Sequence, residues 1–479
     1  MNFRMVLYLL GWILNMESVF MALPCVTALI YGETAGIHFL ITAVVTAIIG
    51  FLLTFKKPTN RTIHAREGFV IVALGWILMS IVGAMPFFVS GEIPHFEDAL
   101  FETISGFTTT GASILTNVEG LSKCMLMWRS FSHWIGGMGV LVFMLAILPM
   151  VGGQTMHLLR AESPGPVVSK IVPKMRDSAA LLYIIYIVMT IVEILLLVVT
   201  KMPLFDAITL SFGTAGTGGF AVKNSGVADY AAVHHTIITV FMILFGVNFN
   251  VYFLMIARKP KDILKNEEVR WYFIIIIAAI LGITLSVHGM FDSWLEAFRH
   301  SAFQVASIIT TTGYATADFN LWPMFPQLVL VLLMFIGACA GSTGGGIKVS
   351  RILISAKAVK KELYRLIHPR NVKVLKMDGK KVEHETLRSI NVFLFAYTIV
   401  FVISIFIVSL DNFEFSGTFT AVAATLNNIG PGLGQVGPMS NFSEFSVLSK
   451  CVMMFDMLAG RVEIFPMLLL LVPATWKRQ

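Results

Sequence analysis

The sequence predicts an all-α polytopic membrane protein, with two N-terminal spans followed by four pseudo-symmetric span–half-helix–span repeats around one axis. Three observations predict it: the composition, ten apolar segments, and a glycine-containing turn that recurs four times. Of 479 residues, 56% are hydrophobic and 13% are charged, whereas soluble domains are about 25% charged. So few charges cannot cover a soluble surface, which excludes soluble enzymes, nucleic-acid-binding proteins and disordered chains.

Ten segments are long and apolar enough to cross a membrane, at about 20 residues each. They lie near 3–30, 37–55, 68–90, 123–150, 179–200, 230–257, 270–290, 326–350, 388–410 and 446–473. The first resembles a signal peptide, but apolar residues resume after Glu17 and no small-residue cleavage site follows. We therefore expect an uncleaved first helix.

The net charge of +7 follows the predicted topology. Of the 35 Lys and Arg residues, 28 lie between the apolar segments or at the chain ends, at Arg4, 56–67, 151–178, 258–270, 348–388 and 477–479. The positive-inside rule places these stretches, and both termini, in the cytoplasm. The charge therefore fixes orientation and requires no nucleic acid as partner.

Four of the outer connections have the same organisation. They are 91–122, 201–229, 291–325 and 411–445. Each starts with a short helix-like run and ends in a turn rich in Gly with Thr or Pro, at Gly111, Gly218, Gly313 and Gly430. These glycines are 107, 95 and 117 residues apart, which indicates an internal repeat of about 100 residues. Because each repeat contains two spans, all four copies share one orientation, unlike the inverted repeats of many transporters.

The repeat divides the chain into five predicted units. They are the hairpin 1–67 and the repeats 68–178, 179–269, 270–387 and 388–479, of which the third contains the Gly-rich interruption 337–346.

Four turns at membrane depth imply a shared aqueous axis, because non-helical backbone is tolerated there only when buried in protein or lining water. The half-helices direct their partially negative C-terminal ends inward, which favours a cation. Glycine with positive φ aims successive carbonyls at one centre, where they replace the hydration shell of an alkali ion. The predicted ligands are Thr110, Gly111, Thr217, Gly218, Thr312, Gly313, Ile429 and Gly430.

One such turn alone is more typical of a capped helix end, so the prediction of an ion filter depends on the four aligned copies. The second copy reads Ala-Gly-Thr-Gly and the fourth reads Asn-Ile-Gly-Pro, without threonine. With one glycine counted per turn, we expect few stacked ion sites and soft discrimination between K⁺ and Na⁺.

The eighth segment is interrupted by glycines over 337–346. A phosphate-binding loop is excluded because Ile347 separates Gly346 from Lys348 and no strand precedes. Two readings stay open: close helix packing through small residues, or a flexible intramembrane loop that obstructs the pore. The candidate gate residues are Gly341, Ser342, Thr343, Gly344, Gly345, Gly346 and Arg461.

Other charged residues also have two readings. Arg461, in the middle of the tenth segment, either faces the pore or forms a structural pair with Asp456. Arg129 and His133 lie four apart, and we favour packing against the first half-helix. The acidic residues of the half-helix regions either concentrate cations or anchor the helices, and they are Glu102, Asp206, Glu296 and Glu414.

These motifs resemble the Trk/Ktr/HKT superfamily of potassium transporters. The resemblance covers essentially the whole chain and rests on the four turns, on Arg-Ser-Phe-Ser-His-Trp-Ile-Gly-Gly-Met-Gly at 129–139, and on Gly-Ser-Thr-Gly-Gly-Gly-Ile-Lys at 341–348. Two spans before the first repeat favour the TrkH/TrkG membrane subunits of bacterial Trk systems. The resemblance implies channel-like K⁺ uptake across the bacterial plasma membrane, a gating loop with an arginine beside it, a homodimer, and control by a cytosolic TrkA-type nucleotide-binding subunit.

The competing functions are an ion-coupled secondary transporter (K⁺/H⁺ or K⁺/Na⁺ symport, or an organic solute) and a membrane enzyme. Polar side chains in inverted halves would favour a solute transporter, and no catalytic motif lies within a span. We therefore predict no enzyme activity and no cofactor, with K⁺ as the transported ion.

The longest predicted stretch outside the membrane is 348–388, whose 41 residues include 12 Lys and Arg. A Rossmann-type domain needs more than about 100 residues, so nucleotide control requires another chain. We expect that chain to dock on 348–388; the alternative is that these charges fix topology and contact anionic lipid. The four cysteines have no metal or redox spacing and are expected to be buried, inert thiols.

Overall fold

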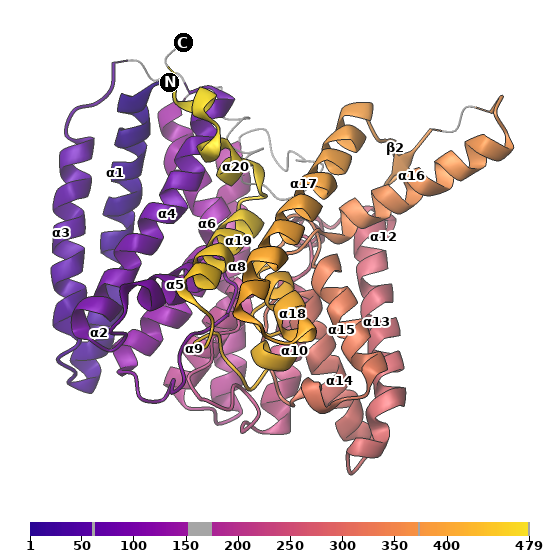
Figure 1. Cartoon of the computed structure of the whole chain (residues 1–479), viewed down its shortest axis with the longest axis horizontal. Coiled ribbons are helices and arrows are strands. Elements are labelled where there is room, and N and C mark those ends of the chain that lie inside the picture. Colours follow the sequence, from indigo (N-terminus) through magenta and orange to yellow (C-terminus); the bar gives the residue numbers. More distant parts are fainter. Residues whose placement is uncertain (60–62, 152–174, 372–373, 478–479) are drawn as a thin grey trace.

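The computed structural model describes residues 1–59, 63–151, 175–371 and 374–477, and its regular structure is almost entirely helical. The exception among these residues is a small antiparallel hairpin of β1 (Lys376–Met377) and β2 (Lys380–Lys381). Both termini lie at the same end of the molecule as this hairpin and α16 (Val349–Ile367) (Figure 1). Of the predicted basic loop 151–178, residues 152–174 lie outside the described residues.

The N-terminal hairpin consists of α1 (Phe3–Phe20), α2 (Ala22–Tyr31) and α3 (Gly36–Thr54). α1 packs closely on α3 because two glycines face each other. A β-carbon built on Gly11 would lie 3.0 Å from the carbonyl oxygen of Gly50. A larger residue at either position would push the helices apart.

The remainder of the chain forms four copies of a span, a short half-helix and a second span, as predicted. The first spans are α4 (Ala65–Ser90), α8 (Met175–Val199), α13 (Glu267–Val287) and α17 (His384–Val408). The half-helices are α5 (Phe96–Phe107), α9 (Leu204–Gly216), α14 (Trp294–Ile309) and α18 (Phe415–Leu426). The second spans are α6 (Lys123–Val151), α10 (Ala232–Phe245) with α11 (Phe249–Ile256), α15 (Met324–Ile336), and α19 (Val447–Arg461) with α20 (Phe465–Leu471).

Short elements complete the chain. They are α12 (Pro260–Lys265) and the 3₁₀ turns His288–Met290, Phe319–Leu321, Ser409–Asp411, Gly434–Val436 and Pro473–Trp476.

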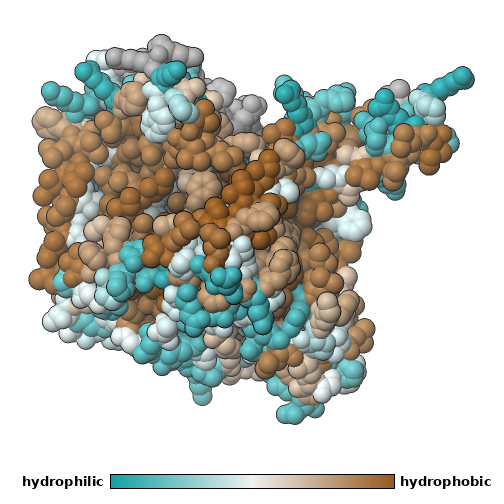
Figure 2. Space-filling model, in the orientation of Figure 1, coloured by the Kyte–Doolittle hydropathy of each residue, from teal (hydrophilic) through white to brown (hydrophobic). Residues whose placement is uncertain are grey.

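Among the described residues, six helices are long and apolar enough to cross a membrane, and the bent pair α10–α11 makes a possible seventh. Many of their apolar side chains face outward, including Leu29, Phe395 and Phe406, each more than two-thirds exposed. Figure 2 shows the matching surface, a broad hydrophobic band between hydrophilic ends. A continuous apolar band of this kind fits a bilayer rather than water, so the chain is a multi-pass membrane protein.

The prediction of ten continuous spans is wrong for three second spans. α10 and α11 meet at 89°, where Asn248 caps α11 by accepting a hydrogen bond from the Asn250 amide at 2.9 Å. α15 ends at Ile336, before the glycines. The tenth segment breaks after Arg461, because Pro466 has no N–H to continue a helix.

Candidate functional site

The four turns after the half-helices follow the same backbone path. Each begins with a residue in the left-handed region, at Thr109 (φ 56°), Thr217 (55°), Thr311 (60°) and Asn428 (56°). The next amide donates to the carbonyl five residues back at 2.8 to 2.9 Å: Thr110 to Ser105, Gly218 to Gly213, Thr312 to Ser307, and Ile429 to Ala424. This hydrogen bond is characteristic of the Schellman motif at the end of a helix. The four repeats therefore match one another even in individual hydrogen bonds.

The second turn differs by one residue from the sequence prediction. The glycine with positive φ is Gly219 (80°), equivalent to Gly111 (76°), Gly313 (86°) and Gly430 (97°). Gly218 instead occupies the position of Thr110, Thr312 and Ile429. Two adjacent glycines follow Thr217, and sequence alone does not reveal which takes the left-handed backbone. Gly218 has a different reason to be glycine: a β-carbon there would lie 2.2 Å from Cγ of the His133 ring.

The four glycines with positive φ close a ring, which we call the ring glycines: Gly111, Gly219, Gly313 and Gly430. Each faces a carbonyl oxygen of a neighbouring turn, closer than a side chain allows. A β-carbon would lie 2.0 Å from that oxygen in three cases and 2.8 Å in the fourth, the pairs being Gly111 with Gly218, Gly219 with Thr312, Gly313 with Ile429, and Gly430 with Thr110. These contacts run from the first turn to the second, from the second to the third, from the third to the fourth, and from the fourth back to the first. The four turns therefore surround one axis.

The ring is held from behind by Arg129 and His133 on α6. The guanidinium of Arg129 pairs with Glu102 at 2.8 Å, with both side chains buried, and donates to the carbonyl of Ala221 at 3.1 Å. His133 donates from Nδ1 to the carbonyl of Gly106 at 2.7 Å and accepts the amide of Phe220 at Nε2, at 3.2 Å. These two residues therefore join the first half-helix to the second turn, in agreement with the packing role favoured from sequence.

Three of the four acidic residues in or near the half-helices have a polar partner in the structure. Besides the Glu102 pair, Asp206 accepts the hydroxyl of Tyr230 at 2.9 Å and Glu296 pairs with Arg299 at 3.3 Å. Glu414 stands at the N-cap of α18 without a capping hydrogen bond. Among the described residues there is no group of three His, Cys, Asp or Glu that could hold a metal ion.

The Gly-rich segment between α15 and α16 forms a non-helical loop directly against the ring. The amide of Gly345 donates to Oγ1 of Thr311 at 2.6 Å. β-Carbons built on Gly344 and Gly345 would lie 2.8 Å from the carbonyl oxygen of Thr310 and 2.4 Å from that of Asn427, respectively. The glycines thus permit backbone-to-backbone contact with the third and fourth turns, and we call 337–348 the intramembrane loop.

Neighbouring helices hold this loop in place. The bend between α10 and α11 contributes two backbone hydrogen bonds, from Cys339 to Gly246 at 3.1 Å and from Phe249 to Gly341 at 3.0 Å. Glu268, buried at the start of α13, accepts the amides of Ala340 at 2.7 Å and Ser350 at 3.1 Å. The side chain of Lys348 folds back onto the carbonyl of Gly344.

Arg461 is the last residue of α19 and reaches across to two other elements. It donates to the carbonyl of Thr343 in the intramembrane loop at 2.9 Å and to that of Gly136 on α6 at 2.6 Å. Its guanidinium carbon lies 5.9 Å from the centre of the Trp76 ring. Asp456, the alternative partner expected from the sequence, accepts the hydroxyl of Ser404 at 2.8 Å, and Glu463 pairs with Arg351.

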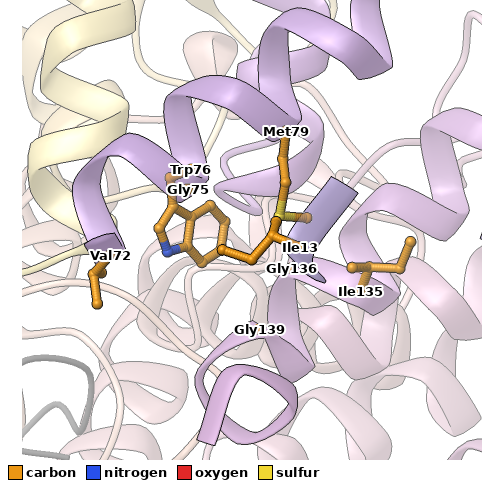
Figure 3. Close-up of a pocket in the computed structure, with 8 residues that line it drawn as sticks. All are labelled: Ile13, Val72, Gly75, Trp76, Met79, Ile135, Gly136 and Gly139. Atoms are coloured by element: carbon orange, nitrogen blue, oxygen red, sulfur yellow. The ribbon is translucent and has the colours of Figure 1, made fainter. Parts of the chain in front are cut away.

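Trp76 and Gly136 also border a small apolar pocket between α1, α4 and α6 (Figure 3). It is lined by Ile13, Val72, Gly75, Trp76, Met79, Ile135, Gly136 and Gly139. None of these eight residues has an oxygen in its side chain, so the lining provides no side-chain ligand for an alkali cation.

The sequence predictions missed four residues of this site: Gly219, Asn428, Glu268 and Lys348. For Asn428 a local signal existed, because Asn tolerates the left-handed conformation and follows its half-helix at the same distance as Thr109 follows α5. For Glu268 no local signal existed, since its partners are 72 and 82 residues away.

The fold and site define a multi-pass membrane protein in which four repeated turns surround one axis and contact one another through ring glycines and backbone carbonyls. The family model TrkH, described as a cation transport protein, matches residues 35–478. The chain is 37% identical over 485 residues to the Trk system potassium uptake protein TrkH of Salmonella typhimurium, with both chains covered completely. It is 34% identical to TrkG of Escherichia coli K12, with 99% of each chain covered.

A solved structure shows the same arrangement. The crystal structure of the potassium transporter TrkH from Vibrio parahaemolyticus matches with a TM-score of 0.89 and 35% identity, over 100% of both chains. The chain belongs to the TrkH family. Both the predicted family and the predicted fold class are confirmed.

Proposed function

We propose that this chain takes up potassium across the bacterial plasma membrane through a channel-like pore, with both termini in the cytoplasm. The observation that carries the proposal is the closed ring of four turns, in which each ring glycine faces a carbonyl of its neighbour. The relatives named as potassium uptake proteins support K⁺ as the cargo. The proposed K⁺ ligands are backbone carbonyls of the predicted filter residues, with Gly219 added.

The same site argues against a transporter of organic solutes. Such a site needs polar side chains that fix the solute, whereas the oxygens facing the ring are carbonyls spaced by glycine contacts. Four half-helices direct their C-terminal ends at this ring, and their partial negative charge favours a cation there. No acid or base chemistry is required of the pore.

We further propose that the intramembrane loop and Arg461 gate the pore. The loop lies against the third and fourth turns, and Arg461 adds a positive charge bonded to Thr343 of the loop. A fixed cation beside the path opposes the passage of K⁺ until it moves away. Conduction therefore requires displacement of the loop, of Arg461, or of both.

The regulatory partner in this proposal is a TrkA-type nucleotide-binding protein that docks on 348–388. The first two residues of α13 connect this region to the gate. Glu267 pairs with Lys357 of α16 and accepts the amide of Asp378 in the β-hairpin at 3.1 Å. Its neighbour Glu268 holds the intramembrane loop. A force on the hairpin or α16 therefore reaches the loop through adjacent residues.

We also propose that the chain works as a homodimer. α16 has four apolar side chains that are each more than half exposed: Val359, Leu363, Leu366 and Ile367. A second copy of the chain would bury these side chains.

The test is ⁸⁶Rb⁺ flux into proteoliposomes with the membrane potential clamped. A pore gives Rb⁺ influx down its own gradient without an H⁺ or Na⁺ gradient, and K⁺ competes more strongly than Na⁺. Influx that requires an imposed H⁺ or Na⁺ gradient would instead establish the coupled symporter, which is the alternative function.

A further inference from the structure

The residues at the left-handed position of the four turns contact different surroundings. The side-chain hydroxyl of Thr217 donates to the carbonyl of Gly216, within its own turn, at 2.6 Å. Thr311 accepts the Gly345 amide of the intramembrane loop. Asn428 takes the place where the other turns have threonine, and it is completely buried.

The side-chain amide of Asn428 joins three parts of the molecule. Its Nδ2 donates to Oγ1 of Thr110 in the first turn and to the carbonyl of Met457 on α19, both at 2.9 Å. Two hydrogens thus serve two acceptors on separate elements. A threonine hydroxyl has one hydrogen and a shorter reach, so it cannot replace both bonds.

The backbone that bears Arg461 packs directly on the same turn. A β-carbon built on Gly460 would lie 2.1 Å from the carbonyl oxygen of Leu426 and 2.8 Å from Oδ1 of Asn428. Arg461 follows Gly460 at once and bonds to the intramembrane loop. Any displacement of the end of α19 therefore acts on the fourth turn through the Asn428 side chain.

The left-handed backbone does not by itself explain this asparagine. Thr109, Thr217 and Thr311 adopt φ angles within a few degrees of Asn428, so threonine fits this conformation in three equivalent places. The feature particular to Asn428 is the pair of hydrogen bonds to Thr110 and Met457.

We propose that Asn428 is a specificity-determining and positioning residue that couples the filter to the gate. It ties the fourth and first turns to α19, so that the spacing of the Ile429 and Thr110 carbonyls depends on where α19 holds Arg461. Thr311 forms a second tie, from the third turn to the loop. This inference rests on the proposed filter and gate, and it adds that K⁺/Na⁺ selectivity changes with the state of the gate.

The test is a double-mutant cycle on ⁸⁶Rb⁺ influx, measured with and without excess Na⁺. Asn428→Thr alone should reduce Rb⁺/Na⁺ discrimination several-fold and raise basal influx, because α19 loses its hydrogen bond to the fourth turn. Combined with Arg461→Ala, its effect on both readouts should be clearly less than multiplicative, since either change releases the same tie. The matched comparator is Thr217→Val combined with Arg461→Ala, whose effects should multiply because Thr217 has no bond to the gate.

If Asn428→Thr fails to reach the membrane, a second pair of variants tests the same coupling. Thr311→Val removes the acceptor for the Gly345 amide and should likewise couple to Arg461→Ala, and Thr311→Ser, which keeps the hydroxyl, should restore wild-type discrimination. Multiplicative effects of Asn428→Thr and Arg461→Ala, each active alone, would overturn the coupling and leave the filter and gate standing. An Arg461→Ala variant with wild-type influx would overturn the proposed gate and the coupling with it.

Discussion

The ring glycines meet two constraints at once. Their φ angles lie between 76° and 97°, where a residue with a β-carbon pays about 1–2 kcal/mol. The space beside them is also filled, because a β-carbon would overlap the carbonyl of the next turn. The second constraint matters more for transport, since relief of that overlap must move the carbonyl oxygens that we propose as K⁺ ligands.

Replacing any ring glycine by Ser should lower Rb⁺/Na⁺ discrimination several-fold while leaving membrane insertion intact. The variants are Gly111→Ser, Gly219→Ser, Gly313→Ser and Gly430→Ser, measured by Na⁺ competition against Rb⁺ influx. The control is Gly32→Ser, since Gly32 also has positive φ (69°) but no atom within 4 Å of its β-carbon position. Unchanged competition in all four ring variants would remove the filter assignment.

The buried pair of Glu102 and Arg129 is expected to matter for stability. Glu102→Ala leaves a buried guanidinium without its carboxylate, a change that costs about 3–5 kcal/mol in buried pairs. The control is Glu362→Ala, because Glu362 and Arg365 form an exposed pair at 3.6 Å and such pairs contribute about 0–1 kcal/mol. Thermal unfolding in detergent should show a large drop in Tm for Glu102→Ala alone; equal drops would contradict a special role for the buried pair.

Among the elements, the proposed gate combines a loop without regular structure and the end of a helix. Gly337, Gly341 and Gly346 have positive φ, which bends the chain between α15 and α16. Glycine adopts this conformation at a lower conformational energy than any other residue. The loop is held by hydrogen bonds to α10, α11 and α13, in addition to the burial of Ala338 and Cys339. Segments with such contacts open more easily than the helices around them.

Arg461→Ala, or deletion of several glycines within 341–346, should raise basal Rb⁺ influx, because each removes an obstruction rather than an ion ligand. A control is Arg365→Ala, whose side chain is exposed on α16 and contacts neither the loop nor the ring. Both gate variants should retain Rb⁺/K⁺ competition. Reduced influx in both, at normal expression, would show that these residues serve packing instead.

At the scale of the whole molecule, the four repeats share a plan but have taken on different contacts. The first and second turns are braced by Arg129 and His133, whereas the third and fourth touch the intramembrane loop. The third repeat also continues into α16 and the β-hairpin, which carry most of the charge of 348–388 (Figure 1). Under the proposed regulation, a force on α16 or the β-hairpin would therefore reach the ring from the side of the third and fourth turns.

Reversing several charges on this region should weaken association with a TrkA-type subunit while leaving the filter intact. Suitable positions are Lys360, Lys361, Lys380 and Lys381, none of which lies in a salt bridge among those of the described residues. Pull-down of the subunit should fall and become more sensitive to salt, with Rb⁺/Na⁺ discrimination unchanged. The control reverses the four basic residues of 258–265, so that the same number of charges is changed elsewhere in the chain. Full binding by the altered 348–388 region would refute docking there, and reduced binding to anionic vesicles alone would assign these charges to lipid.

The sequence by itself determined the local features. Apolar runs, half-helices and the Gly-rich break follow from hydropathy and backbone preference within about 30 residues, and the described residues contain each of them. The second turn marks the limit of this reasoning, because Gly218 and Gly219 are equivalent until the His133 ring and the carbonyl of Thr312 are in place.

How these features meet depends on contacts between residues far apart in the chain. Asn428 bonds to Thr110 across 318 residues, and Arg461 bonds to Gly136 across 325. No periodicity or propensity encodes such pairs, since they depend on the closure of four repeats around one axis. The break after Arg461 belongs here too: Pro466 signals that a helix must stop, but only the packed loop and α6 determine what the arginine at its end contacts.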